Sequence, residues 1–324
     1  MKILITGCCG FIGFHLTKKL LEKNHSVLGL DNLNDYYDVN LKKKRLRILK
    51  KKNFLFKKIN ILNYEKLYRN TKNYKPDIII NLAAVAGVRH SLKAPRDYIN
   101  NNIIGFFNIL ELSRNLNIKY IFYASSSSVY GKNKLKPFCE DHPIMSPIST
   151  YGASKGCNEL LAHAYSHLYK IKTIGLRFFT VYGPWGRPDM ALFKFTKAII
   201  NNKKIDIYNK GKMKRNFTYI NDVVVSIEKL INKKSAFTDN FNIFNIGNTK
   251  TYPLMKFIKE IEIQIKKKAK RAFLNMQQGD IESAPCSYSK LKRKINFEPK
   301  TSIKVGIKNF LDWYFTYYKI KKKS

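Results

Sequence analysis

The chain has 324 residues, of which 44% are hydrophobic, and its formal net charge at pH 7 is +39. A chain of this length can bury a substantial core and is long enough for two lobes. No apolar run is long enough to cross a bilayer, and the five cysteines show neither metal-ligand spacing nor a disulfide framework, so we expect a soluble, cytoplasmic protein with reduced thiols.

A dinucleotide-binding turn is predicted at the start of the chain. Lys2 to Thr6 is a short apolar run typical of a buried strand, and Gly7, Gly10 and Gly13 follow it. This spacing suits a tight turn, close approach of the backbone to a pyrophosphate, and close packing of the next helix, roughly Phe11 to Lys23. The free N–H groups at the start of that helix favour phosphate binding.

A second strand is predicted from Ser26 to Leu30, and Asp31 follows it directly. An acid at this point accepts hydrogen bonds from the adenosine ribose and repels a 2′-phosphate, so NAD is favoured over NADP. Strand-like runs then alternate with helical stretches, which predicts an α/β fold with a Rossmann-type, doubly wound parallel sheet. These runs are Phe54 to Ile59, Asp77 to Leu82, Tyr120 to Ala124 and Thr173 to Phe178.

Catalytic residues are predicted around the next helix, Thr150 to His167. Tyr151 and Lys155 lie four residues apart on it, so both side chains face the same way. A tyrosine is a poor base at neutral pH, and a lysine ammonium with a positive nicotinamide ring would lower its pKa. Ser126 would share the proton of a substrate hydroxyl. Gly152 costs the helix about 1 kcal/mol relative to alanine, which indicates close approach of a ligand or a neighbouring backbone.

The character of the sequence changes after residue 179. A loop rich in proline and glycine, a helix from about Met190 to Asn201 and a strand from Ile205 to Tyr208 are typical of a smaller second lobe. The chain is expected to return to the first lobe at about Phe217 to Ile231 and Phe241 to Asn248. The predicted domains are a dinucleotide-binding domain at residues 1–179 and about 217–248, and a second lobe at about 180–216 and 249–324.

Four longer segments are more diagnostic than the glycine turn. They are Asp31–Asp38 (DNLNDYYD), Ala83–Arg89 (AAVAGVR), Arg177–Met190 (RFFTVYGPWGRPDM) and Lys212–Ile220 (KMKRNFTYI). With the turn and the Tyr-Lys pair, they resemble the extended short-chain dehydrogenase/reductases, the NAD-dependent epimerase/dehydratase family. Within that family the sequence is most similar to the UDP-glucuronate 4-epimerases, from Met1 to about Tyr318.

The resemblance implies an isomerase of carbohydrate metabolism that interconverts UDP-glucuronate and UDP-galacturonate, for polysaccharide biosynthesis. Tightly bound NAD would oxidise C4 transiently while Tyr151 takes the O4 proton. Ser126 would polarise O4, and Lys155 would also hold the nicotinamide ribose. The second lobe would bind the nucleotide sugar, and the chain would form a homodimer through two helices of the larger lobe.

The resemblance and the motifs together assign residues to two binding sites, and no metal site is expected. The residues expected to bind NAD are Gly7, Gly10, Phe11, Ile12, Gly13, Asp31, Asn32, Asn60, Ile61, Leu82, Ala83, Ala84, Asn102, Tyr151 and Lys155. Those expected to bind the UDP-hexuronic acid are Arg89, Ser127, Ser128, Thr180, Arg187, Met190, Tyr208 and Arg215. Asn216 and Asn221 stand where the family carries aspartates beside Arg215, which removes negative charge that would position this arginine.

Alternative functions remain open from the sequence. Ser127 and Ser128 stand where related decarboxylases and dehydratases carry acids, so epimerisation without decarboxylation or elimination is favoured. A UDP-glucose 4-epimerase or another UDP-sugar enzyme is the alternative, followed by a non-catalytic protein that senses the cofactor or binds nucleic acid. The lysines are spread along the chain without a nucleic-acid-binding motif, so neither a specific nucleic acid nor a membrane is expected as partner.

Overall fold

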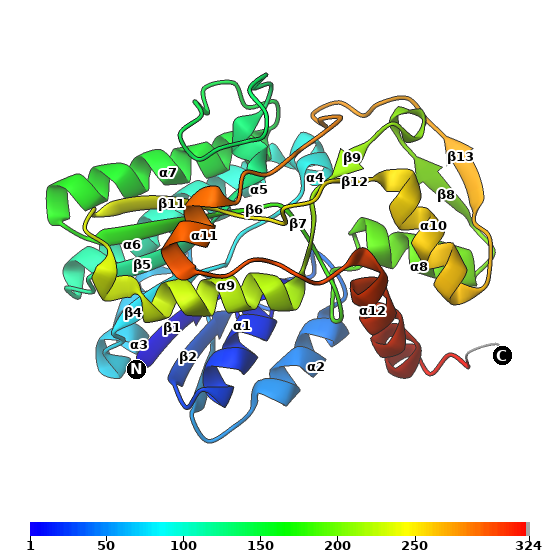
Figure 1. Ribbon diagram of the computed structural model, residues 1–324. Coiled ribbons are helices and arrows are strands. Elements are labelled where there is room, and N and C mark those ends of the chain that lie inside the picture. Colours follow the sequence, from blue (N-terminus) through cyan, green and yellow to red (C-terminus); the bar gives the residue numbers. More distant parts are fainter. Residues whose placement is uncertain (322–324) are drawn as a thin grey trace.

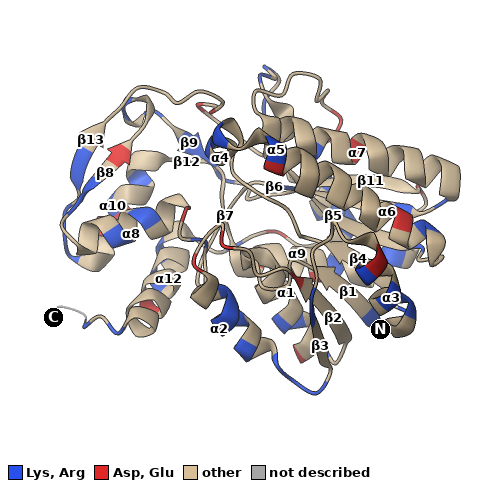
Figure 2. Cartoon of the chain, turned by 180° about the vertical axis from the view of Figure 1, so that it is seen from behind, with Lys and Arg blue, Asp and Glu red and all other residues tan. Residues whose placement is uncertain are grey.

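The structure is a computed structural model and describes residues 1–321; residues 322–324 of the expected second lobe lie outside the described part. Figure 1 shows a larger lobe, in which helices cover both faces of a central sheet, and a smaller lobe beside it. Within residues 1–321, no helix is long and apolar enough to cross a membrane. Figure 2 shows Lys and Arg scattered across both lobes in the face that it presents.

The larger lobe is built on a seven-stranded parallel sheet, which confirms the predicted Rossmann-type fold. Its strands, in spatial order, are β11 (Phe241–Ile246), β6 (Lys172–Phe178), β5 (Tyr120–Ser126), β4 (Ile78–Asn81), β1 (Lys2–Thr6), β2 (Ser26–Asp31) and β3 (Phe54–Lys58). The chain runs outward from β1 to β3 and then crosses to β4 on the other side. Ligands of such sheets bind where the strand order reverses, at the carboxyl ends of the strands.

Helices bury both faces of this sheet, so its strands are nearly continuous apolar runs. One face is covered by α1 (Phe11–Glu22), α2 (Val39–Leu49), α9 (Ile220–Asn232) and α11 (Ser289–Ile295). The other is covered by α3 (Tyr64–Tyr74), α6 (Gly105–Asn115) and α7 (Thr150–Tyr169). In α9, buried Val223, Val224, Ile227, Leu230 and Ile231 recur at helical spacing, which explains why this segment is a helix.

The smaller lobe has its own apolar core between three helices and a two-stranded sheet. The helices are α8 (Ala191–Ile200), α10 (Leu254–Ile265) and α12 (Ile303–Tyr318), and the strands are β8 (Lys204–Ile207) and β13 (Lys270–Phe273). Short elements connect the lobes and the loops: α4 (Val88–Lys93), α5 (Pro95–Tyr98), η2 (Ser127–Tyr130), β7 (Thr180–Tyr182), η3 (Asn209–Gly211), β9 (Lys214–Arg215), β10 (Phe217–Tyr219), η4 (Lys234–Ala236) and β12 (Tyr252–Pro253).

One element is not anticipated from the sequence, and one domain assignment differs from the expectation. Residues Ile99–Ile104 form a π-helix, η1, between α5 and α6. The segment from residue 249 onward is not confined to the smaller lobe, because α11 packs on α9 and β11. Leu291 and Ile295 of α11 belong to the core of the larger lobe. Sequence composition does not separate these two cores, since the helices of both are amphipathic.

Four helices end at an exposed lysine in the left-handed region. These are Lys75 after α3, Lys170 after α7, Lys266 after α10 and Lys319 after α12, with φ between 53° and 57°. Glycine is the usual residue at such positions because it has no Cβ to clash with the backbone.

We expect replacement of any of these four lysines by glycine to stabilise the protein. The strain of about 1–2 kcal/mol is removed and is offset only in part by the greater freedom of glycine in the unfolded chain. Lys266→Gly should raise the free energy of unfolding by about 0.5–1 kcal/mol in denaturant titrations. Lys259→Gly, inside the same helix α10 at an exposed position, is the matched control and should lower it by about 1 kcal/mol. A loss of stability in Lys266→Gly would contradict the argument.

Candidate active site

A cleft of about 1060 Å³ is lined by both lobes and lies at the carboxyl ends of the central strands. The larger lobe contributes the glycine turn after β1, Asp31 at the end of β2, the segment after β4, and Ser126 at the end of β5. The smaller lobe contributes residues around β8 and β9, among them Tyr208 and Arg215. A long cleft of this kind suits an extended ligand that spans both lobes.

The glycine turn leaves room for a pyrophosphate beside α1. Gly7 has φ +71°, and a Cβ there would lie 2.7 Å from the Ala83 nitrogen. A Cβ on Gly13 would lie 2.1 Å from the Gly7 carbonyl oxygen, so only glycine lets the helix come this close to the turn. Helix α1 begins after Gly10 with no side-chain cap and no acid in its first turn, which suits an anion at its N-terminus.

Asp31 is held at the edge of the same turn. Its carboxylate accepts hydrogen bonds from the Cys9 nitrogen at 3.0 Å and the Leu33 nitrogen at 2.8 Å. Burial raises the pKa of Asp31, and these two N–H groups oppose the shift. The turn, the uncapped helix and this carboxylate together fit the adenosine and pyrophosphate of NAD.

Tyr151 and Lys155 project from one face of α7 toward the end of β5. Helix α7 begins where Ser149 Oγ accepts a hydrogen bond from the Gly152 nitrogen at 3.0 Å. Lys155 Nζ donates to the Ala124 carbonyl oxygen at 2.8 Å. Burial lowers the pKa of Lys155 to about 7, and the attraction of Glu159 opposes this.

The expected lowering of the Tyr151 pKa is not seen in the protein alone. Burial raises the pKa of this phenol, although a hydrogen bond with Ser126 and the positive charge of Arg187 act in the opposite direction. The sequence attributes the lowering to the Lys155 ammonium and the positive nicotinamide ring, whereas the chain's own groups that oppose burial are Ser126 and Arg187. The nicotinamide ring is not part of the chain. A phenolate at neutral pH therefore requires that additional charge.

The prediction of a close approach at Gly152 is confirmed. A Cβ on this residue would lie 2.6 Å from the Ser128 carbonyl oxygen. The neighbour is thus the backbone of η2, directly after Ser126. Glycine at this position lets α7 lie against the segment that carries the expected catalytic and substrate-binding serines.

At the other end of the cleft, Arg215 is paired with Asp280, with Nη2 and Oδ1 2.7 Å apart. Burial and the nearby Arg89 lower the pKa of Arg215, and Asp280 opposes them. Arg89 itself stacks on the ring of Tyr208, with the guanidinium carbon 4.3 Å from the ring centroid. Two guanidinium groups at this end suit a diphosphate.

The exchange of aspartate for Asn216 leaves Arg215 with a carboxylate partner, because Asp280 supplies it. Asn216 instead bonds to the backbone of Asn248: its Nδ2 donates to the Asn248 carbonyl oxygen at 2.6 Å, and its Oδ1 accepts from the Asn248 nitrogen at 2.7 Å. An amide can do both at once, whereas an ionised carboxylate only accepts.

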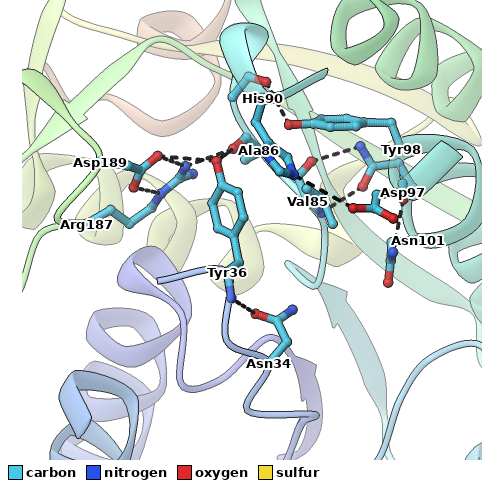
Figure 3. A network of polar contacts seen from close by, with 12 residues as sticks. Asn34, Tyr36, Val85, Ala86, His90, Asp97, Tyr98, Asn101, Arg187 and Asp189 are labelled. Carbon is cyan, nitrogen blue, oxygen red and sulfur yellow. Dashed lines mark hydrogen bonds and ion pairs between the residues drawn. The ribbon is translucent and has the colours of Figure 1, made fainter. Parts of the chain in front are cut away.

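A network of polar contacts joins three loops across the cleft (Figure 3). Tyr36 donates to the Ala86 carbonyl oxygen at 3.0 Å and approaches Asp189 at 3.4 Å. Arg187 donates to the same Ala86 oxygen at 2.8 Å and pairs with Asp189 at 2.5 Å. Burial alone would lower the pKa of Arg187, but Asp189 raises it. This network fixes the position of Arg187. Tyr98 lies beside the network, and its ring packs edge-on against that of Tyr151, with the two ring centroids 5.9 Å apart.

The structure brings all the expected site residues to the cleft surface except Gly13 and Asn102. Asn102, on η1, is buried behind the cleft wall. Its Oδ1 accepts a hydrogen bond from the Val85 nitrogen, and its Nδ2 donates to the Val85 carbonyl oxygen and to Ser154 Oγ, both at 3.0 Å. It therefore supports the loop after β4 and α7 instead of lining the cleft. Tyr36, Asp189 and Asp280 line the cleft and were not among the expected residues, although Tyr36 and Asp189 lie in the diagnostic segments.

Comparisons with known proteins agree with this geometry. Residues 3–247 match the NAD dependent epimerase/dehydratase family. Protein CapI of Staphylococcus aureus is 49% identical over 98% of this chain and 100% of that protein. A probable UDP-glucuronate 4-epimerase of Rhizobium meliloti (strain 1021) is 42% identical over 98% of each. The solved UDP-glucuronic acid 4-epimerase of Bacillus cereus, in complex with UDP-glucuronic acid and NAD, is 31% identical, with a TM-score of 0.90 over 98% of this chain and 100% of that one.

Proposed function

Because the chain belongs to the NAD dependent epimerase/dehydratase family, we propose that it is a UDP-glucuronate 4-epimerase, which interconverts UDP-glucuronate and UDP-galacturonate. Its cofactor is NAD. The observation that carries this function is the meeting of Tyr151, Lys155 and Ser126 in the middle of one cleft. The glycine turn and Asp31 lie in the larger lobe on one side of them, and Arg215 with Tyr208 lies in the smaller lobe on the other.

In the proposed reaction, Tyr151 as phenolate takes the proton from the sugar O4 and later returns it, while Ser126 polarises the same oxygen. Lys155 stabilises the phenolate through its charge. Bound NAD supplies a reversible hydride acceptor for C4 and a positive charge near the phenol. The 4-keto sugar turns about its diphosphate between removal and return of the hydride, so the configuration is inverted with no net redox.

Substrate recognition is assigned by the same proposal to both lobes. Arg215 and Arg89 face the diphosphate, and Thr180 and Ser127 face the sugar carboxylate. Each of these residues lines the cleft. Ser127 and Ser128 add no carboxylate beside the reacting carbon, which supports return of the hydride without loss of carbon dioxide.

The test is to incubate the purified protein with UDP-glucuronate without added NAD and to follow the anomeric protons by NMR. We expect UDP-galacturonate to form, which also shows that NAD is retained through purification. A UDP-pentose would instead indicate decarboxylation, and conversion of UDP-glucose alone would indicate the neutral-sugar epimerase. No product even after addition of NAD would contradict the proposal.

Two further parts of the proposal concern which lobe binds which ligand and where in the cell the protein lies. The larger lobe, which includes α11, binds NAD, and the smaller lobe binds the nucleotide sugar. A cytoplasmic, reducing location is supported by the free state of all five cysteines, including adjacent Cys8 and Cys9 with sulfurs 3.8 Å apart.

A homodimer is also part of the proposal. Figure 1 shows α6 and α7 side by side along one edge of the larger lobe. Large apolar side chains are 42–66% exposed on these helices and on η1, namely Ile99, Ile104, Phe107, Leu160 and Leu168. Scattered exposed apolar residues are normal, but their gathering on adjoining helices suits a partner copy.

We expect Leu160→Asp to convert the dimer to a monomer, because burial of one leucine contributes about 1.5–3 kcal/mol and a buried carboxylate opposes association. Light scattering coupled to size-exclusion chromatography measures the mass. Val305→Asp is the matched control, since Val305 is also half exposed but lies on α12 in the smaller lobe. An unchanged mass in Leu160→Asp, or an equal change in both variants, would rule out this interface.

A further inference from the structure

Behind the cleft wall, Glu159 lies one helical turn after Lys155 on α7. It is 3% exposed, and its carboxylate is surrounded by donors. Ser125 Oγ donates to Oε1 at 2.5 Å, Arg177 Nε donates to Oε1 at 2.9 Å, and Arg177 Nη2 donates to Oε2 at 2.8 Å. Neither Glu159 nor Arg177 lines the cleft, so neither touches a ligand there.

Arg177, on β6, is buried like Glu159 and makes further hydrogen bonds of its own. It is 3% exposed, and its Nη1 donates to the Tyr130 hydroxyl at 2.9 Å and to the Glu140 carbonyl oxygen at 3.0 Å. The Glu159 carboxylate is therefore fixed by its ion pair with Arg177, and Lys155 lies one helical turn away on the same helix. Buried ion pairs hold their geometry because an unpaired buried charge is strongly unfavourable.

Glu159 is the acidic group whose charge acts on Lys155. The hydrogen-bond acceptor of Lys155 is a neutral carbonyl, that of Ala124, and burial otherwise favours the neutral amine. An opposite charge on the same helix face, four residues away, counteracts this burial. Through Ser125, the same carboxylate also ties α7 to the end of β5, one residue before Ser126.

We propose that Glu159 is a positioning residue of the epimerase, whose carboxylate, held by Arg177 and Ser125, favours the charged ammonium form of Lys155, one helical turn after Tyr151. The inference rests on the proposed function, because it needs Lys155 and Tyr151 as the proton-handling pair. The other titratable or charged groups around this pair are Tyr123 on β5, Tyr130 on η2, Arg177 on β6, Glu140 in the loop after η2, Tyr98 on α5 and Arg187 after β7. The Glu140 carboxylate accepts a hydrogen bond from the Asn245 nitrogen at 2.9 Å, so its partner is the backbone of β11.

The deciding variant is Glu159→Gln, which keeps the shape of the side chain and removes its charge. Competitive acetylation of the purified protein, followed by peptide mapping, measures the pKa of Lys155 without reference to any substrate. We expect this pKa to fall by about one to three units. Turnover needs the charged lysine and is lost as the pH rises through its pKa, so the alkaline limb of kcat should move to lower pH by a similar amount.

Two further variants separate charge from structure. Arg177→Gln breaks the same ion pair but keeps the Glu159 charge, so it should not lower the pKa of Lys155. Glu262→Gln is the matched control. Glu262 is also buried and accepts two hydrogen bonds from an arginine, Arg271, but it lies in the smaller lobe. It should leave the pKa of Lys155 and the pH profile unchanged.

If the single variants do not fold, the double variant Glu159→Gln with Arg177→Gln removes both charges of the ion pair, so neither residue is left as an unpaired charge, and it should show the lowered pKa of Lys155. An unchanged pKa in Glu159→Gln or in the double variant overturns the inference. An equal fall in Arg177→Gln overturns it as well, since the effect would then be structural. If the parent protein epimerises nothing, a lowered pKa of Lys155 in Glu159→Gln still upholds the role of Glu159, and only the proposed function is refuted.

Discussion

Tyr151→Phe is expected to abolish epimerisation while NAD stays bound. The variant loses the group that is assigned to exchange a proton with the sugar O4, and removal of a general base lowers turnover by about 10²–10⁴-fold. The ring itself remains, so its edge-on contact with Tyr98 and the shape of the cleft are kept. The anomeric protons of UDP-glucuronate and UDP-galacturonate give the rate, and the absorbance of NAD released on denaturation gives the cofactor content.

The matched control for this variant is Tyr288→Phe. Tyr288 is a buried tyrosine whose hydroxyl lies 3.2 Å from Ser226, and it does not line the cleft. It should lose no more than the stability of one hydrogen bond, about 0.5–1.5 kcal/mol, and keep full activity. Normal turnover in Tyr151→Phe would refute the assignment of the base, and loss of NAD with activity would leave a structural explanation.

Gly13→Ala is expected to remove the retained NAD and to destabilise the larger lobe. The added methyl group would lie 2.1 Å from the Gly7 carbonyl oxygen and 3.1 Å from the Cys8 Cα, and both neighbours are backbone atoms of the turn. Either α1 or the turn must move, at a cost of about 1–3 kcal/mol. Because the same turn is shaped for the pyrophosphate, NAD affinity should fall with stability.

The chain offers a close control in Gly156→Ala. Gly156 also lies inside a helix, α7, but a Cβ there would meet only Ile144 Cδ1, at 3.8 Å. Alanine is favoured over glycine in a helix by about 1 kcal/mol, so this variant should be as stable as the parent or more stable. Calorimetry and the NAD content of the purified protein measure both effects. Retention of NAD by Gly13→Ala would show that the turn is more adaptable than its geometry indicates.

Local sequence patterns predict the parts of the fold and site that depend on neighbours along the chain. The glycine turn, α1 and Asp31 follow from spacing within some thirty residues, and α7 follows from its helical periodicity. Even the close approach at Gly152 was visible as a glycine in an otherwise regular helix. In each case the residue type limits the backbone, and the backbone determines what can lie next to it.

Contacts between distant segments were not accessible in this way. Glu159 meets Arg177 only because β5 and β6 pair in a particular register under α7. Asp280 reaches Arg215 from a loop 65 residues away, and Asn102, on η1, bonds behind the cleft wall to Val85 and Ser154. The sequence of Lys and Arg residues along the chain does not reveal which of them will form an ion pair with an acidic side chain. The raised pKa of Tyr151 likewise follows from burial, which depends on the whole fold.

The packing of α11 on α9 and β11 affects how the protein can be synthesised. The core of the larger lobe includes Leu291 and Ile295, so it remains incomplete until residue 295 has left the ribosome. The first 248 residues contain every strand of the central sheet but leave the apolar surface beneath α11 open to water. The larger lobe therefore cannot complete its core before α8, β8, α10 and β13 of the smaller lobe have been synthesised. The nascent chain therefore exposes this apolar surface until α11 has been synthesised, and exposed apolar surface makes a folding intermediate prone to aggregation.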